Sequence, residues 1–148
     1  TAELASPGAF SKRTINFLHT MDSSDAVLFE KLSGFVWQIN DFMPLIFKSN
    51  DEIYRSNGIN FELLEHLASI GLINHSSVTE YSLKPVVEAG TAQYFEMELV
   101  INFNSDNPTL NMGHASFTQI GKELYSLTNA LPVEGFFDYV RDQWSNHI

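Results

Sequence analysis

The segment from Asn60 to Gly71 limits the fold more than any other part of the sequence. Its main apolar positions recur at helical spacing, at Leu63, Leu64, Leu67 and Ile70. Asn60 is a favourable N-cap, because its side chain can accept a hydrogen bond from a backbone N–H group, and Gly71 is favourable just after a helix. Leu72 and Ile73 follow at once as extended chain. The sequence therefore predicts a helix over residues 60–71 that leads directly into a strand.

A second strong pattern, with a period of two, runs from Ala92 to Phe103. Apolar side chains occupy every other position, at Phe95, Met97, Leu99, Ile101 and Phe103. Such alternation is typical of a strand with one face against a core. We expect a single long strand here, ended by the turn-rich run 104–108, with Tyr94 on its polar face. The edge of this strand is also a candidate for pairing with another chain.

The remaining patterns complete an α+β fold that is mostly helical, with a small antiparallel sheet. Apolar residues at three- and four-residue steps predict a long amphipathic helix over 24–40, with a buried stripe at Leu28, Leu32, Phe35 and Ile39. We expect extended chain at 42–47, because Pro44 opposes a helix there. Short strands are predicted at 79–83 and 115–117, and further helices at 118–129 and 133–145.

The length and composition favour one domain with one joint core. The chain has 148 residues, of which 44% are hydrophobic and 13% aromatic, enough to pack a core. Within residues 1–148 we distinguish an N-terminal helical part at 10–48, a second part at 58–130 and a C-terminal helix at 133–146. Because Cys is absent, disulfide scaffolds and thiol chemistry are excluded. No apolar run reaches the roughly 18 residues that a membrane helix needs, so we expect a cytoplasmic domain with no membrane contact.

Three segments of the second part together resemble a known class of domain. They are the helix that ends in Gly71-Leu72-Ile73, the short strand at 81–83, and the run Phe-Thr-Gln-Ile-Gly-Lys-Glu-Leu at 117–124. Over residues 58–128 this order is similar to that of winged helix-turn-helix domains. In that class, a helix ending in Gly-Leu-Ile leads into the wing, and a Thr-x-x-Gly segment leaves it. The resemblance implies a winged-helix-like core, although a fold alone does not fix a function.

The charge distribution opposes direct DNA binding by this part of the chain. The protein has 8 Lys and Arg against 18 Asp and Glu, a net charge of -10. Between Arg55 and Lys122 the only cation is Lys84, whereas DNA binding requires several cations to neutralise phosphates. A nucleic-acid-associated winged-helix domain of a regulator or defence protein is nevertheless the alternative function. The cations that would have to build its binding strip are Lys12, Arg13, Lys31, Lys48 and Arg55.

Five further segments, at 24–32, 35–37, 51–54, 58–61 and 137–140, extend the pattern of the two motifs above. Together they make nearly the whole sequence similar to an uncharacterised bacterial family, the domain of unknown function twenty-eight hundred and six. The chain also resembles, more distantly, the C-terminal part of phage-exclusion proteins of the abortive infection, alpha type. The family implies no activity and no catalytic residues. Because the chain begins at Thr1 without Met, we expect it to be the C-terminal region of a longer protein.

The aromatic residues supply the leading hypothesis about function. The sequence has 12 Phe, 5 Tyr and 2 Trp, more than one modest core requires, although a Phe-rich core is the alternative explanation. Trp and Tyr are common at binding hot spots. We therefore expect an exposed anchor patch for a protein partner or a second copy of the chain, formed by Trp37, Phe42, Phe47, Tyr54 and Tyr94. On this hypothesis the chain is a non-catalytic protein-interaction or oligomerisation domain of a bacterial or phage-related protein.

No motif in the sequence indicates catalysis, a cofactor or a metal. Glycine-rich phosphate loops and the Gly-x-Ser-x-Gly pattern are absent, and no two His lie within four residues of each other. Glu62 and His66 share one face of the predicted helix, which we interpret as an exposed polar face. His114 precedes Ser116 by two residues without a visible orienting acid. We predict no enzyme activity, no cofactor and no metal; a hydrolase site built from dispersed His and carboxylates is a third alternative.

Overall fold

A computed structural model describes residues 10–84, 89–103 and 108–145 of the chain. Its helices are α2 (Lys12–Thr20), α3 (Ser23–Ser33), α4 (Glu52–Arg55), α5 (Phe61–Ser69), α6 (Gln119–Tyr125) and α7 (Phe136–Ser145). Its strands are β1 (Val36–Ile39), β2 (Asp41–Pro44), β3 (Ile73–His75), β4 (Tyr81–Leu83), β5 (Ala89–Tyr94), β6 (Met97–Asn102), β7 (Leu110–Gly113) and β8 (Ala115–Phe117). Helices and small antiparallel sheets together make the predicted α+β fold.

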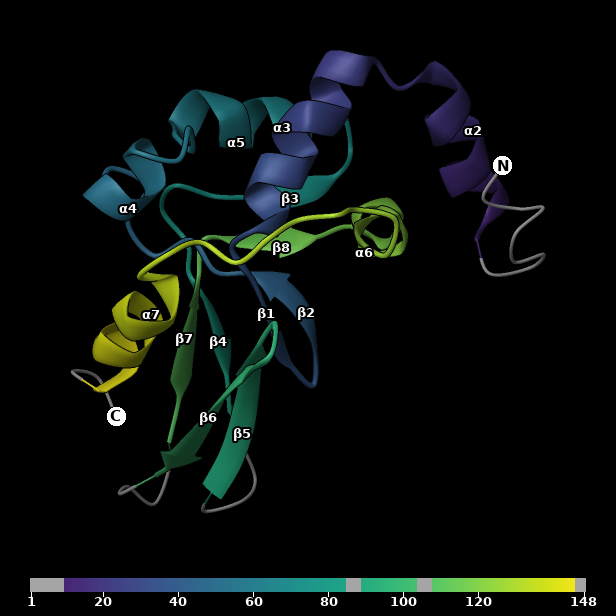
Figure 1. The fold of residues 1–148 in the computed structure, drawn as a ribbon. Helices are drawn as coiled ribbons and strands as arrows, with labels where there is room; N and C mark the ends of the chain where they lie inside the picture. Colours follow the sequence, from purple (N-terminus) through teal and green to yellow (C-terminus); the bar gives the residue numbers. More distant parts are fainter. Residues whose placement is uncertain (1–9, 85–88, 104–107, 146–148) are drawn as a thin grey trace.

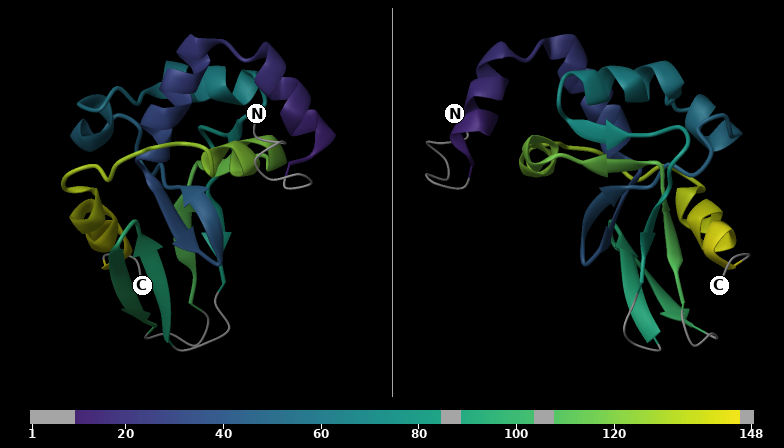
Figure 2. Two further views of the ribbon diagram at one scale, coloured as in Figure 1. Left: turned by 45° about the vertical axis from the view of Figure 1, so that its right-hand side comes forward. Right: turned by 180° about the vertical axis from the view of Figure 1, so that it is seen from behind.

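The strands lie in one larger sheet and two short pairs. The larger sheet has the order β2-β1-β5-β6, and β3 pairs with β8 while β4 pairs with β7, all antiparallel. Helices α2, α3, α4 and α5 gather at one end of the molecule, next to the β3–β8 pair, and the other strands extend away from that end (Figure 1). Helix α7 contacts β7 through a hydrogen bond of 2.8 Å that the Trp144 side chain donates to the Asn111 carbonyl, and the two elements lie side by side when the molecule is seen from behind (Figure 2).

The predicted long helix over 24–40 is wrong in its second half. Helix α3 ends at Ser33, and the chain continues through a turn into β1. The stretch that follows Gly34 is rich in aromatic and β-branched residues, which favour a strand when half-buried. Asn40 then adopts a φ of 64° at the tip of the β1–β2 hairpin, a conformation that Asn tolerates better than most residues. The part predicted as helical, 10–48, therefore also contributes two strands to the main sheet.

The single strand predicted over 92–103 is instead a hairpin. Strands β5 and β6 pair in register from Ala89 with Asn102 to Tyr94 with Met97. The chain reverses at Phe95, whose φ is 54°. The alternating pattern continues through both arms, and neither Phe95 nor Glu96 is a residue that normally signals a tight turn. The sequence pattern therefore gave no sign that the chain reverses direction at this point.

The two motifs behind the winged-helix resemblance are joined by hydrogen bonds, and we call this junction between Gly71 and Thr118 the clamp. The Asn60 side chain caps α5 by accepting a hydrogen bond from Leu63 N at 2.8 Å, as predicted. Thr118 caps α6 in the same way, by accepting from Gly121 N at 3.1 Å, and its hydroxyl also donates to the Gly71 carbonyl at 2.6 Å. The chain between these motifs forms two separate pairings, β4 with β7 and β5 with β6. The winged-helix likeness of residues 58–130 remains a prediction.

One continuous cluster of buried residues joins the helical end to the sheet. At its centre, the Trp37 ring stacks on Tyr94 with ring centroids 5.3 Å apart and on Phe137 at 5.4 Å, and meets Trp144 edge-on at 5.3 Å. Aromatic pairs of this kind add about 0.5–1.5 kcal/mol each beyond the burial of their area. Helix α7, close to its predicted bounds, closes the core through Phe136 and the second tryptophan.

Candidate protein-interaction surface

Four of the five predicted anchor residues lie in the core rather than on the surface. Trp37, Tyr54 and Tyr94 are 0% exposed, and Phe47 is 6% exposed. The expected exposed patch is therefore wrong for these four residues. The physical reason is that their rings stack on one another and on α7, so the aromatic excess is used in packing. The alternative of a core rich in aromatic residues describes them correctly.

Phe42 is the one predicted anchor with substantial exposure, at 38%. It lies in β2 and rests against the Tyr125 ring, with centroids 5.1 Å apart. The neighbouring Asp41 carboxylate accepts a hydrogen bond from Lys122 at 2.5 Å, which lowers the pKa of that carboxyl group. Phe42 is thus a single half-covered ring beside an ion pair, not the centre of a patch.

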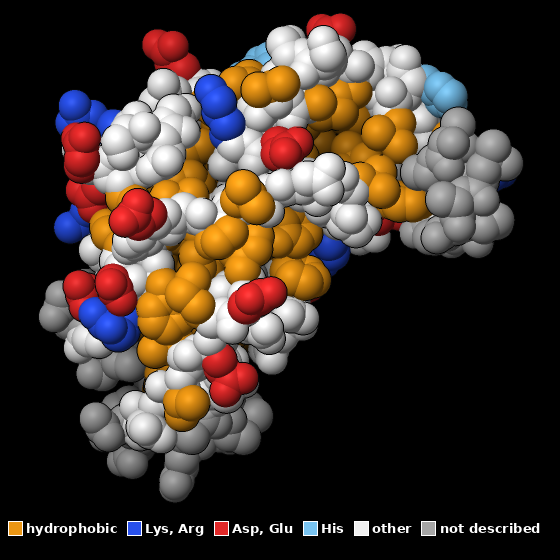
Figure 3. Space-filling model, in the orientation of Figure 1, with side chains coloured by type: hydrophobic (Ala, Val, Ile, Leu, Met, Phe, Trp, Pro, Cys, Tyr) orange, Lys and Arg blue, Asp and Glu red, His pale blue; other side chains and the backbone are white. Residues whose placement is uncertain are grey.

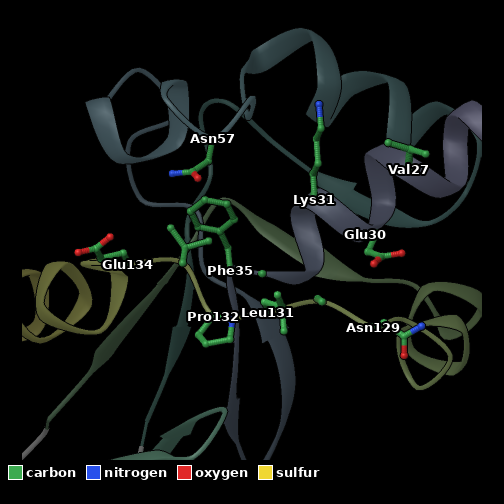
Figure 4. A pocket seen from close by; sticks show the side chains of 12 residues that line it. Val27, Glu30, Lys31, Phe35, Asn57, Asn129, Leu131, Pro132 and Glu134 are labelled. Carbon is green, nitrogen blue, oxygen red and sulfur yellow. The ribbon is translucent and has the colours of Figure 1, made fainter.

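A groove that the sequence did not reveal lies between α3 and the segment that links α6 to α7. Its volume is about 570 Å³. One wall carries Val27, Glu30 and Lys31 of α3, and the linking segment supplies Leu131 and other residues of 129–134. The close view shows the Phe35 ring between these walls (Figure 4). The Phe35 ring itself is 0% exposed, so the accessible lining comes from the two walls, whose segments lie about a hundred positions apart in sequence.

Each wall of this groove carries an apolar side chain that is open to water. Val27 is 57% exposed and Leu131 is 78% exposed. In the space-filling view, hydrophobic side chains run across this face of the molecule, interrupted by single acidic side chains (Figure 3). Exposed apolar residues that adjoin one another, with polar residues around them, mark surfaces that bind other molecules. Val27 lies off the buried stripe of α3, and this offset is the only sequence signal that could have indicated the groove.

The Tyr94 hydroxyl fixes the spacing of the two walls. It donates a hydrogen bond to the Gly34 carbonyl at 2.5 Å and accepts one from the Val133 N–H group at 2.6 Å. Burial raises the pKa of Tyr94 to about 12, so the hydroxyl stays protonated at neutral pH. A Cβ atom on Gly34 would lie only 3.1 Å from the Leu131 carbonyl oxygen. Glycine at this position therefore lets the linking segment approach the end of α3.

The charges around the groove are mainly negative. Glu30 and Glu134 contribute two carboxylates and Lys31 one cation to its lining. The whole chain carries a net charge of -10. A groove in such a chain attracts positively charged segments and repels acidic ones.

The comparison with known families gives one match. The family model described as "Protein of unknown function (DUF2806)" matches residues 1–141. The chain belongs to this family. No curated protein and no solved structure matches the chain. Among the described residues of this family member, none of the helices is both long and apolar enough to cross a membrane.

The five cations named for the nucleic-acid alternative are dispersed in this family member. Lys12 lies on α2, and Arg55 ends α4, at the opposite side of the helical end (Figure 1). Lys31 lines the groove described above, whereas Lys48 lines a different hollow, beside β4 and β7. Arg13 follows Lys12 on α2. The five side chains thus do not converge on one strip, and no observation favours the nucleic-acid alternative over the leading hypothesis.

Each of three histidines in the described part of the chain lies near a different carboxylate. His66 Nε2 is 2.7 Å from Asp25 Oδ1, and His75 Nδ1 is 2.7 Å from Glu65 Oε1. His114 Nε2 is 3.7 Å from Glu80 Oε1. Ser116 does not pair with His114, because its hydroxyl instead accepts a long hydrogen bond of 3.4 Å from the Asn74 side chain. No cluster of three or more His, Asp or Glu able to hold a metal occurs among the described residues.

Proposed function

We propose that this domain is a non-catalytic protein-interaction module whose binding surface is the groove between α3 and residues 129–134. The observation that carries the proposal is the pair of exposed apolar side chains, Val27 and Leu131, on opposite walls above the buried Phe35 ring. Exposed apolar side chains on two sides of a hollow resemble the centre of a protein interface more than a solvated surface.

The occupant that we propose is a short segment of another protein that has apolar anchor residues flanked by Lys or Arg. The groove volume of about 570 Å³ accommodates a few side chains, which suits a short segment rather than a whole domain. The carboxylates of Glu30 and Glu134 lie beside the apolar walls and would pair with basic flanks. The net charge of -10 adds a long-range attraction for such a segment.

Self-association through the same groove is the second outcome that the test distinguishes. Two copies would bring a charge of -10 against a charge of -10, which opposes association at low salt. A homo-oligomer would therefore form more readily as salt is added, whereas binding of a basic segment would weaken. This opposite salt dependence separates the two occupants.

The test is selection from a random peptide library displayed on phage, with the folded domain as the bait. We expect the enriched peptides to combine apolar residues with Lys or Arg. Their binding, measured by fluorescence anisotropy, should fall about tenfold or more in the variants Val27→Ser and Leu131→Ser, the scale of a lost interface anchor. The matched control is Val78→Ser, because Val78 is 89% exposed and does not line the groove.

The outcomes of this test are decisive in both directions. If the selected peptides bind Val27→Ser and Leu131→Ser as well as the unchanged protein, the groove is not the binding surface. Enrichment of acidic peptides would contradict the charge argument. Light scattering at low and high salt decides between the peptide-binding and self-association versions, since only self-association raises the measured mass.

The wider setting of the proposal rests on the sequence. The resemblance to phage-exclusion proteins supports a place for the domain in a larger bacterial or phage-related protein that acts in the cytoplasm. In that setting the domain would recruit a partner while another part of the protein performs any chemistry.

A further inference from the structure

Lys31 is a cation of the groove that has no carboxylate partner among the described residues. It lines the groove, and it forms no ion pair within the described part of the chain, whereas Lys122 pairs with Asp41. The positions three and four residues before and after it, where a helix places ion-pair partners, hold uncharged residues: Val27, Leu28, Gly34 and Phe35. The ammonium group can therefore pair with a bound molecule.

The loop between α4 and α5 supports the Lys31 side chain at one rim of the groove. A Cβ atom on Gly58 would lie 3.6 Å from Lys31 Cδ and 3.4 Å from Lys31 Nζ, so the lysine stem passes over the bare backbone of this glycine. Gly58 has a φ of 82°, in the left-handed region that favours glycine. Lysine stems cover protein surface in this way while the charged group stays in water. The rim therefore presents the ammonium group at a defined place.

The charges along the groove follow a definite order. In the close view, Glu134 lies on one side of the groove and Glu30 on the other, and Lys31 lies between them on the rim opposite Leu131 (Figure 4). Neither glutamate forms an ion pair with the described residues. The order of charges is therefore negative, positive, negative. A segment that crosses the groove meets complementary charges throughout only if an acidic residue lies between its basic ones.

We propose that Lys31 binds an Asp or Glu side chain of the segment that occupies the groove and so selects the register of that segment. The inference rests on the proposed function and adds one requirement to it, a single carboxylate between the basic flanks of the partner. A Lys or Arg at that position would face the ammonium group, and this repulsion opposes binding in a wrong register. Because Lys31 is exposed, the ion pair adds little affinity and acts mainly on specificity.

A charge swap between the protein and its peptide tests the inference. The probe is the most enriched peptide of the phage selection described above, and we expect it to carry Asp or Glu at one fixed position between its basic residues. Lys31→Glu should weaken the binding of this first peptide about tenfold, because an attraction is lost and a repulsion is gained. A second peptide, with Lys in place of the acidic residue, should bind Lys31→Glu about tenfold more tightly than it binds the unchanged protein.

The matched control is Lys12→Glu, which changes the net charge by the same amount. Lys12 lies on α2 and lines a different hollow, so this variant should bind the first peptide within about twofold of the unchanged protein. Fluorescence anisotropy measures all of these affinities. Tight binding of the second peptide to Lys31→Glu also shows that this variant is folded.

Three results would overturn the inference and leave the proposed function intact. The first is a set of groove-dependent peptides with no acidic residue at a fixed position, and the second is unchanged binding of the first peptide to Lys31→Glu. The third is a loss in Lys31→Glu that the second peptide does not reverse, because Lys31 would then act without pairing with a carboxylate. If Val27→Ser and Leu131→Ser leave peptide binding unchanged, the proposed function itself fails and the inference fails with it.

Discussion

Replacing Tyr94 with Phe removes the hydroxyl that joins the two walls of the groove and leaves the ring in place. The hydroxyl makes two hydrogen bonds, to the Gly34 carbonyl and from the Val133 N–H group, at a residue that is 0% exposed. Without it, one buried acceptor and one donor lose their partner, and each such loss costs about 1–3 kcal/mol. The ring keeps its stacking on Trp37. Because the Val133 N–H group is only part-buried and loses less than the buried Gly34 carbonyl, we expect Tyr94→Phe to lower the free energy of unfolding by about 2–4 kcal/mol.

Urea unfolding followed by tryptophan fluorescence measures this change. With a denaturant slope of about 2 kcal/mol per molar urea, the midpoint should fall by roughly 1–2 M with the slope unchanged. Tyr81→Phe is the matched control, because Tyr81 is only partly buried and its hydroxyl has no hydrogen bond to the described residues. The expected change for this control is below about 0.5 kcal/mol. If the two variants have the same midpoint, the Tyr94 hydroxyl does not join the walls as described.

The pH dependence gives an independent check on the same hydroxyl. Burial raises the pKa of Tyr94 to about 12 in the folded protein, whereas an unfolded tyrosine titrates near 10. Between these two values the folded state holds the proton more tightly, so stability is fully present below about pH 10 and is lost as the pH rises toward 12. Burial raises the pKa of Tyr54 and Tyr139 in the same direction. Tyr94→Phe should reduce this alkaline loss of stability by up to about 1.4 kcal/mol per pH unit.

Three further substitutions test the clamp between the two sequence motifs and the caps of its helices. Gly121→Ala would place a Cβ atom 1.9 Å from the Leu72 carbonyl oxygen, a clash with backbone, so thermal unfolding should show a loss of more than about 3 kcal/mol. Gly90→Ala is its control, since a Cβ atom there meets nothing within 4 Å and stability should stay within about 1 kcal/mol. Thr118→Val keeps the shape but removes the cap of α6 and the bond to the Gly71 carbonyl, and should cost about 1–2 kcal/mol in urea unfolding. Asn60→Ala removes the cap of α5 and should cost about 1 kcal/mol in the same assay, whereas a cost near zero would show that the cap is dispensable.

The sequence predicted the fold best where a local signal and the tertiary structure agree. Helix α5 begins after its predicted cap and ends before Gly71, whose φ of 92° confirms the expected left-handed conformation. The caps of α5 and α6 were correct because a cap is a contact between neighbours in the chain. Helix α7 was also found close to its observed bounds.

The errors arose where one periodic pattern covers two elements. The apolar residues of 24–40 fit a helical spacing, yet Phe35 and Ile39 belong to a turn and a strand. In β5 and β6, alternation persists on both sides of a turn that lacks Gly, Asn or Pro at its centre. A period describes which side chains face the core and carries no direct information about where the chain reverses.

The candidate surface was not predicted, because the amino-acid composition does not show which aromatic residues pack in the core and which stay exposed. The prediction placed the surplus aromatic residues on the surface, but Trp37, Tyr54 and Tyr94 are buried in the core. The exposed apolar side chains at the groove are instead Val27 and Leu131. The core nevertheless sets the distance between the walls of the groove, since the Tyr94 hydroxyl holds the linking segment against the end of α3. Tyr94, which was predicted to contact a partner, thus supports the proposed binding groove from inside the core. Its replacement should weaken peptide binding at the groove without touching the peptide, and rigid support of this kind is what lets exposed side chains bind with little loss of entropy.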